Sequence, residues 1–219
     1  MRYENIIFDM DGLLIDSMMH WIHQDDAFFA PRGIPLTPDM IRYFTGKSLK
    51  ENMTWAKEKF GLKETVEELV QERVDQTDAI YTTLAQPLSG VTALLSTLHA
   101  GGGRQAIASG SPLNRIQNIV DRFAWNTFFE QLISVDHVDH KGKPAPDVYL
   151  YTAKKLGVDP ASCVVFEDAE NGVLAAKAAG MACIAVPDPR WSYGDFSAAD
   201  LSVTSLDDSA VYEFLGYRV

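Results

Sequence analysis

Two aspartates separated by one residue follow a short apolar run near the start of the chain. Asp9 and Asp11 come directly after the apolar residues 5–8, and Gly12 follows them. A carboxylate can attack an electrophile, and a second carboxylate within reach can move a proton for it. The pair therefore predicts nucleophilic attack by Asp9 with Asp11 as its acid or base. The alternative is an Asp-Gly turn with an incidental second acid.

Three further groups of polar residues follow apolar runs or lie in the loops beyond them. Ser109 and Gly110 offer a hydroxyl and backbone N–H groups just before a predicted helix, which suits a phosphate. Lys143 is a point charge in a proline-flanked loop, and the acids Glu167 and Asp168 suit a hard cation such as Mg²⁺. Taken singly, these are an ST-turn, a solvated lysine and an acidic helix start. Together with the first pair, they predict one phosphate and metal site.

The elements that must position these residues alternate between apolar runs and helical patterns. Continuous apolar runs of strand length occupy residues 5–8, 105–108, 132–135, 163–166 and 183–186. Strands covered on both faces have this character, and the helical stripes between them predict an α/β fold with a doubly wound parallel sheet. Ligands bind such sheets at the carboxyl ends of the strands, where the polar groups above lie.

Residues 16–86 break this rhythm because they contain no strand-like run. Three helix starts are marked there by an N-cap pattern and two capping boxes, at Thr37, Ser48 and Thr65. A segment of about 70 residues is too long for a loop between a strand and a helix. We expect residues 16–86 to form a small helical domain, and residues 1–15 and 87–219 to form the α/β core.

Charge and cysteine content limit the kinds of partner and the cellular compartment that we expect for this chain. The chain of 219 residues has 19 basic and 30 acidic residues, a formal net charge of −11, which repels nucleic-acid backbones and anionic lipid. No apolar run approaches the ~20 residues that span a bilayer, and no targeting segment precedes the first strand, so a cytoplasmic protein is expected. Cys163 and Cys183 lie in apolar runs and are predicted to be buried free thiols. The oligomeric state stays open, a monomer included.

The polar motifs keep a recognisable order along the chain. They are Asp9-x-Asp11-Gly12, Ser109, Lys143-Pro144 and Glu167-Asp168. In this order they resemble the haloacid dehalogenase superfamily, and more closely its subgroup of β-phosphoglucomutase and the small sugar- and polyol-phosphate phosphatases. The resemblance covers essentially the whole chain. It implies that Asp9 forms an aspartyl-phosphate, that Asp11 is the general acid and base, and that Ser109 and Lys143 hold the transferring phosphoryl group.

The same resemblance implies a Mg²⁺ cofactor and a cap over the site. The metal ligands would be Asp9, the main-chain carbonyl of Asp11 and Asp168, with Glu167 helping. A carboxylate can approach a phosphate dianion only where positive charge offsets the repulsion, and Mg²⁺ with Lys143 would supply it. The helical insert would be the cap that closes over the site and excludes water.

Substrate selection is expected from the cap. Residues 45–48, with Lys47, are the candidate reading loop, although an ordinary turn between helices has the same pattern. The chain has Trp21 where the mutase pattern has a histidine, and Leu49 is the nearest match to a mutase arginine that grips a second phosphate. Both departures favour hydrolysis, and Trp21 would suit the apolar face of a sugar or polyol.

The expected function is therefore a Mg²⁺-dependent phosphatase of small phosphorylated metabolites, with sugar or polyol phosphates first. The alternative is a phosphosugar mutase of the β-phosphoglucomutase type. A dehalogenase would need neither Asp11 nor the metal acids, and a binding module without activity would normally have lost one of these residues. Residues 136–140 resemble a second metal cluster without an anchored spacing. Trp191, Tyr193 and Phe196 are expected in a packed surface loop.

Overall fold

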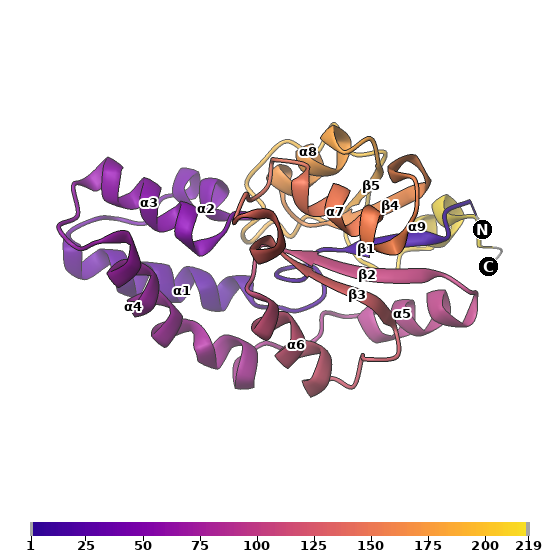
Figure 1. The fold of residues 1–219 in the computed structure, drawn as a ribbon, viewed down its shortest axis with the longest axis horizontal. Coiled ribbons are helices and arrows are strands. Elements are labelled where there is room, and N and C mark those ends of the chain that lie inside the picture. Colours follow the sequence, from indigo (N-terminus) through magenta and orange to yellow (C-terminus); the bar gives the residue numbers. More distant parts are fainter. Residues whose placement is uncertain (1, 218–219) are drawn as a thin grey trace.

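A six-stranded sheet forms the larger lobe of the computed structural model, which describes residues 2–217 (Figure 1). The strands are β1 (Asn5–Phe8), β2 (Arg104–Ser109), β3 (Phe129–Ser134), β4 (Cys163–Glu167), β5 (Ala182–Ala185) and β6 (Leu201–Ser202). Their order is β3-β2-β1-β4-β5-β6, and every neighbouring pair is parallel. The predicted doubly wound α/β sheet is confirmed. β6 has two residues and no apolar run, so the sequence patterns did not reveal it.

Helices cover both faces of this sheet. On one face lie α5 (Val91–Ala100), α6 (Leu113–Arg122) and α9 (Ser209–Leu215), and on the other lie α7 (Asp147–Leu156) and α8 (Glu170–Ala178). Figure 1 shows α5 and α6 below the strands and α7 and α8 above them. Ile6 and Phe8 of β1 belong to the first apolar cluster and Ile7 to the second, because successive strand residues point to opposite faces.

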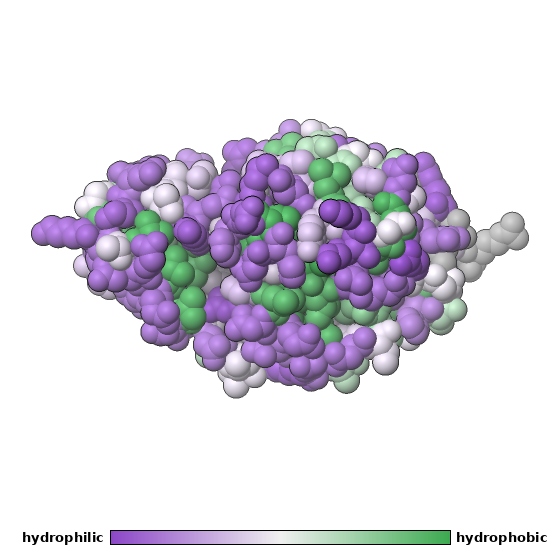
Figure 2. All heavy atoms as spheres, viewed as in Figure 1, coloured by the Kyte–Doolittle hydropathy of each residue, from purple (hydrophilic) through white to green (hydrophobic). Residues whose placement is uncertain are grey.

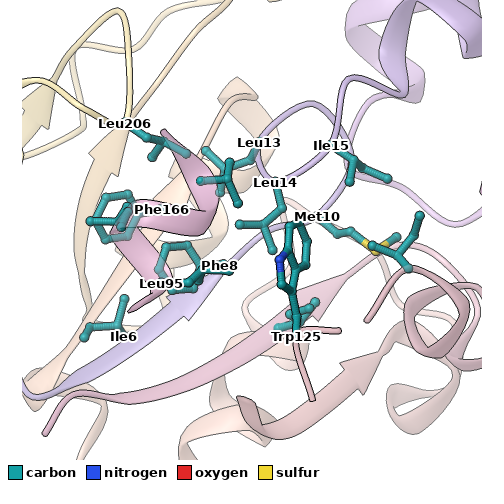
Figure 3. Close-up of a cluster of buried hydrophobic side chains, with 14 of the residues drawn as sticks. Ile6, Phe8, Met10, Leu13, Leu14, Ile15, Leu95, Trp125, Phe166 and Leu206 are labelled. Carbon is teal, nitrogen blue, oxygen red and sulfur yellow. The ribbon is translucent and has the colours of Figure 1, made fainter. Parts of the chain in front are cut away.

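Buried apolar residues hold the segment that follows β1. Phe8 stacks on Phe166 of β4, with ring centroids 4.9 Å apart, and Met10, Leu13 and Leu14 pack in the same cluster (Figure 3). Burying each such side chain contributes about 1.5–3 kcal/mol to stability. This packing holds the turn after β1 in place, and with it the two aspartates on either side of Met10.

A second lobe is built from helices alone. It contains α1 (Met18–Phe29), the 3₁₀ turn η1 (Ala30–Arg32), α2 (Pro38–Phe44), α3 (Leu49–Phe60), α4 (Val66–Ala79) and the π-helix η2 (Ile80–Leu84). The Thr37 hydroxyl accepts a hydrogen bond from the Met40 N–H, and both predicted capping boxes, Ser48–Glu51 and Thr65–Glu68, are formed. Phe28, Phe29, Met53 and Leu69 belong to an apolar cluster of its own. These helices form the expected cap, drawn in indigo and purple in Figure 1.

The chain passes between the two lobes twice, at adjacent points. The Asp16 N–H donates to the Gln86 carbonyl over 2.9 Å, and the Gln86 N–H donates to Asp16 Oδ1 over 2.5 Å. Between residues 16 and 86, all of which are described, no strand joins the sheet. The division of the chain at 15/16 and 86/87 remains a prediction.

Two further 3₁₀ turns, η3 (Val135–Val138) and η4 (Pro160–Ser162), lie in loops. Cys163 and Cys183 are free and buried, as predicted. Hydrophilic side chains cover most of the face in Figure 2. None of the helices within residues 2–217 combines the length and the apolar character needed to cross a membrane.

Candidate active site

A pocket lies between the cap and the carboxyl edge of the sheet. Residues from both lobes line it, among them most of those predicted from the sequence: Asp9, Asp11, Trp21, Lys47, Ser109, Gly110, Glu167 and Asp168. Lys143 contacts Asp9 directly. The structure therefore brings together every candidate site residue, from segments as far apart as β1, β2, β4 and the cap.

Lys143 is fixed by three acceptors at this edge. Its Nζ donates to Asp9 Oδ1 over 2.5 Å, to Glu167 Oε1 over 2.6 Å and to the Ala108 carbonyl over 3.2 Å. The side chain is fully buried, so the alternative of a solvated lysine is wrong. Burial alone would lower the pKa of the Lys143 ammonium, but the carboxylates of Asp9 and Glu167 outweigh it and raise that pKa. Lys143 is a permanent positive charge here.

Glu167 uses both of its oxygens to position neighbouring groups. Oε1 accepts from Lys143 and from the Tyr149 hydroxyl over 2.5 Å, while Oε2 accepts from the backbone N–H groups of Asp168 and Ala169. A Cβ at Gly172 would lie 1.8 Å from this carboxyl group, so α8 can begin here only with a glycine at that position. Four hydrogen bonds leave Glu167 little capacity for a further ligand.

Three buried acids gather beside Lys143. Oxygens of Asp9, Glu167 and Asp168 lie within 4.8 Å of one another. Burial raises the pKa of Asp9 to about 7 and raises that of Asp168 well above its usual value, and repulsion from Glu167 adds to both shifts. One lysine cannot offset three carboxylates, and oxygen ligands suit a hard divalent cation. The donor set therefore fits a metal ion of that kind.

Trp191 fixes the orientation of Asp168 in this cluster. Its Nε1 donates to Asp168 Oδ2 over 3.0 Å, and its side chain is 1% exposed. Trp191 lies in a loop and is packed, as expected, but its side chain points inward to Asp168, a contact that the expectation did not include. The sequence carried a weak signal for this role, because Trp191 follows the strand-like run 183–186 by only a few residues. It could therefore be expected near the carboxyl edge of the sheet.

Three hydroxyl groups position Asp11 in the same pocket. Ser17 Oγ and the Tyr81 hydroxyl donate to Oδ1 over 2.7 and 3.0 Å, and Ser111 Oγ donates to Oδ2 over 2.7 Å. Tyr81 lies in the π-helix η2, a kind of distortion that is frequent at functional sites. Its oxygen also accepts from Trp21 Nε1 over 3.0 Å. The cap thus contributes directly to the placement of Asp11.

The loop after β2 meets the cap loop at close range. Ser109 Oγ accepts from the Ser111 N–H over 3.0 Å, and a Cβ at Gly110 would lie 3.0 Å from the Lys47 carbonyl oxygen. Lys47 Nζ donates to the Lys143 carbonyl over 3.3 Å, while the Lys143 N–H donates to the Gly46 carbonyl over 3.2 Å. The predicted reading loop therefore packs on the Lys143 segment.

Residues 136–140 resemble a second metal cluster in the sequence, but their two histidine rings pair with polar groups close by in the chain. His140 Nδ1 lies 3.2 Å from Asp136 on the surface, and His137 contacts the backbone of Ser134. Within residues 2–217, the only set of three metal-ligating side chains found in mutual reach is the one around Asp9.

Comparison with known families adds an independent observation. The model of a family described as haloacid dehalogenase-like hydrolase matches residues 6–186, which is most of the chain. The chain belongs to the haloacid dehalogenase-like hydrolase family. The resemblance carried by the four sequence motifs is thereby confirmed.

Curated relatives match this hydrolase over nearly its whole length. Hexitol phosphatase B from Escherichia coli (strain K12) is 32% identical over 219 residues, with 96% of each chain covered. A probable pseudouridine-5'-phosphatase from Drosophila melanogaster is 32% identical over 218 residues, covering 97% of this hydrolase and 94% of the relative.

Solved structures of similar fold include a mutase. β-Phosphoglucomutase from Clostridium difficile has a TM-score of 0.79 at 23% identity, with 96% of both chains covered. At this identity the likeness supports the fold of the hydrolase, cap included, and not its substrate.

Proposed function

We propose that this chain is a Mg²⁺-dependent phosphatase of small sugar or polyol phosphates that acts through an aspartyl-phosphate at Asp9. The comparisons place it among the phosphoric monoester hydrolases. The cofactor, the covalent mechanism and the substrate are the proposal. The observation that carries it is the contact between the buried Lys143 ammonium and Asp9, beside Asp168 and at the base of the pocket.

The nucleophile in this proposal is Asp9 Oδ2. Lys143 occupies Oδ1, and no described side chain donates to Oδ2. Oδ2 would form a bond to phosphorus while the bond from phosphorus to the substrate oxygen breaks. Asp11 would pass a proton to that leaving oxygen and would regain one in the second step. In the second step Asp11 would take a proton from water as the water attacks phosphorus, which frees Asp9 and releases phosphate.

Mg²⁺ would be held by Asp9, Asp168 and the carbonyl of Asp11. Bound there, it would supply positive charge that offsets the repulsion between the nucleophile and the phosphate. Asp168 keeps Oδ1 free because Trp191 uses Oδ2. Glu167 would act mainly by holding Lys143, since its own oxygens already accept four hydrogen bonds.

The remaining predicted residues would hold the substrate. Ser109, the Gly110 N–H and Lys143 would contact the phosphoryl oxygens, while Trp21 and Lys47 would lie against the rest of the molecule. Hydrolysis is favoured over the mutase alternative because Leu49, which lines the pocket, carries no charge at the position where the mutase pattern has an arginine.

The test is phosphate release from a panel of sugar, polyol, acid and nucleotide monophosphates, with Mg²⁺ and with excess chelator. We expect release from sugar or polyol phosphates that stops on chelation and returns when Mg²⁺ is added. Full activity in chelator would contradict the metal. With β-glucose 1-phosphate and a trace of the 1,6-bisphosphate, glucose 6-phosphate formed faster than free phosphate would favour the mutase.

A further inference from the structure

One polar atom in the pocket has no hydrogen-bond partner. Asn52 of α3 lines the pocket and is 9% exposed. Its Nδ2 donates to the Phe44 carbonyl over 3.2 Å, and its Oδ1 is buried without a donor among residues 2–217. Exchanging the two amide atoms would bring two acceptors together, so the oxygen is the atom left over. A buried acceptor without a donor destabilises the protein until something supplies one.

A cation in the same pocket also has unused hydrogen-bonding capacity. Arg115 of α6 is 3% exposed, and its Nη2 donates to Thr77 Oγ1 over 2.8 Å and to the Val74 carbonyl over 3.3 Å. The guanidinium lies over the rings of Tyr81 and Trp21, at 4.8 and 5.8 Å from their centroids. Its Nε and Nη1 have no acceptor within the described part of the chain. Arg115 is therefore fixed in place with donors to spare.

No hydrogen bond within residues 2–217 meets these needs of Asn52 and Arg115. The apolar wall of the pocket includes Trp21, Ile22, Leu49 and Met53. Asp25 also lines the pocket, but Arg73 already pairs with its carboxylate. A molecule that enters the pocket can supply the missing donor and acceptor.

We propose that Asn52 and Arg115 select a polyhydroxylated leaving group, an inference that rests on the proposed phosphatase activity. A hydroxyl both donates and accepts, so one can donate to Asn52 Oδ1 and another can accept from Arg115. The apolar wall would contact the C–H face of the carbon chain. A carboxylate satisfies Arg115 but offers Asn52 no proton, and an alkyl chain satisfies neither. Phosphate esters with several hydroxyl groups are therefore the substrates that this pocket fits.

The first arm of the test uses the wild-type protein with Mg²⁺. We would compare kcat/KM for a hexitol 6-phosphate, for n-hexyl phosphate and for phosphoglycolate. A site built to bind hydroxyls rejects analogues that lack them, so the hexitol ester is expected to exceed the hexyl ester by roughly 100-fold or more. Equal values for these two esters would overturn the inference while leaving the phosphatase proposal standing. No phosphate from any ester would instead contradict the phosphatase proposal.

The second arm removes the selecting atoms. Asn52→Leu and Arg115→Met are each expected to lower the ratio between hexitol and hexyl esters to about tenfold or less, through loss on the hexitol ester. The matched control is Asn118→Leu, at an exposed position of α6, which should keep the wild-type ratio. Folded variants that lose activity on both esters equally, with the ratio intact, would overturn the inference.

A substrate series covers the case in which a variant does not fold. Monodeoxy hexitol 6-phosphates remove one hydroxyl at a time from the substrate and leave the protein intact. At least two hydroxyls should each cost roughly tenfold or more in wild-type kcat/KM. A series without such a step would overturn the inference.

Discussion

The pocket has two sides: a sheet side, with Asp11, Glu167 and Lys143, and a leaving-group side, with Asn52 and Arg115. They differ in how many of their polar atoms already have a hydrogen-bond partner in the protein. On the sheet side, Asp11 accepts three hydrogen bonds, Glu167 accepts four and Lys143 donates three. On the leaving-group side, Asn52 Oδ1 has no donor within residues 2–217, and Arg115 keeps donors free. Groups that act on the phosphate are held by the protein itself. Groups that would meet the leaving group lack hydrogen bonds that the substrate can complete.

This difference has a physical consequence for function. A preorganised set of charges costs no rearrangement at the moment of reaction and suits any phosphate ester. An unsatisfied buried atom discriminates, because only a matching substrate relieves it. Changes on the sheet side should therefore lower turnover for every substrate, whereas changes on the other side should alter the choice among substrates.

The largest effect is expected from Asp9→Asn. The amide keeps the shape and can still accept from Lys143, but it cannot attack phosphorus, so kcat should fall by at least about 10⁴-fold for all substrates. Phosphate release measures this, and circular dichroism checks that the protein is folded. Asp78→Asn, at an exposed position of α4, is the matched control. Substantial turnover by a folded Asp9→Asn protein would rule out the covalent step.

The next effect separates the two neighbouring acids at the end of β4, Glu167 and Asp168. Asp168→Asn should lower activity by roughly 10²–10³-fold at fixed Mg²⁺ and raise the Mg²⁺ concentration needed for half activity. Glu167→Gln should lower kcat by roughly 10–100-fold with little change in the Mg²⁺ requirement, because it acts through Lys143. Mg²⁺ titrations of both variants give the comparison. A larger shift in the Mg²⁺ requirement for Glu167→Gln would mean that Glu167 binds the metal directly.

A smaller effect is expected at the junction of the two sides. Tyr81→Phe removes one of three donors to Asp11 and the acceptor for Trp21 Nε1. We expect kcat to fall about tenfold with KM changed less, since Asp11 loses orientation but stays in place. The control is Tyr193→Phe, which removes a single hydrogen bond from a partly exposed tyrosine to the Arg190 carbonyl. An unchanged kcat would show that Ser17 and Ser111 suffice to position Asp11.

The sheet side could be predicted from the sequence because its residues follow strands. Asp9, Ser109 and Glu167 each lie at a strand end, and parallel strands bring their carboxyl ends to one edge of the sheet. Capping boxes likewise marked the cap helices correctly. These are local signals that one stretch of chain carries by itself.

The residues that tertiary packing brings to the pocket could not be predicted in this way. Tyr81 lies 70 positions from Asp11 in the sequence, and Arg115 meets Thr77 only because α6 packs beside the end of the cap. No periodicity marks a residue whose role comes from tertiary packing. Ser111 had a signal that was available, since it stands two residues after Ser109 on the same loop.

The smallest effect concerns the contact that holds the cap against α8. Arg42 donates to Glu170 through Nε over 2.5 Å and Nη2 over 2.8 Å, but its side chain is half exposed. Ion pairs of this exposure contribute little and are weakened by salt. Asn171 Nδ2 also donates to the carbonyls of Arg42 and Thr45, and these bonds need no Arg42 side chain. Arg42→Ala should therefore raise KM only about two- to threefold.

Salt dependence distinguishes this contact from the groups that act on substrate. If the ion pair helps to close the cap, added NaCl should raise the wild-type KM toward that of Arg42→Ala and affect the variant less. The ratio between hexitol and hexyl esters should stay at its wild-type value in Arg42→Ala, because Asn52 and Arg115 are untouched. Steady-state kinetics at low and high NaCl test both points. A collapse of the ester ratio in Arg42→Ala would mean that selection depends on cap closure itself, and the two sides of the pocket would then not be separable.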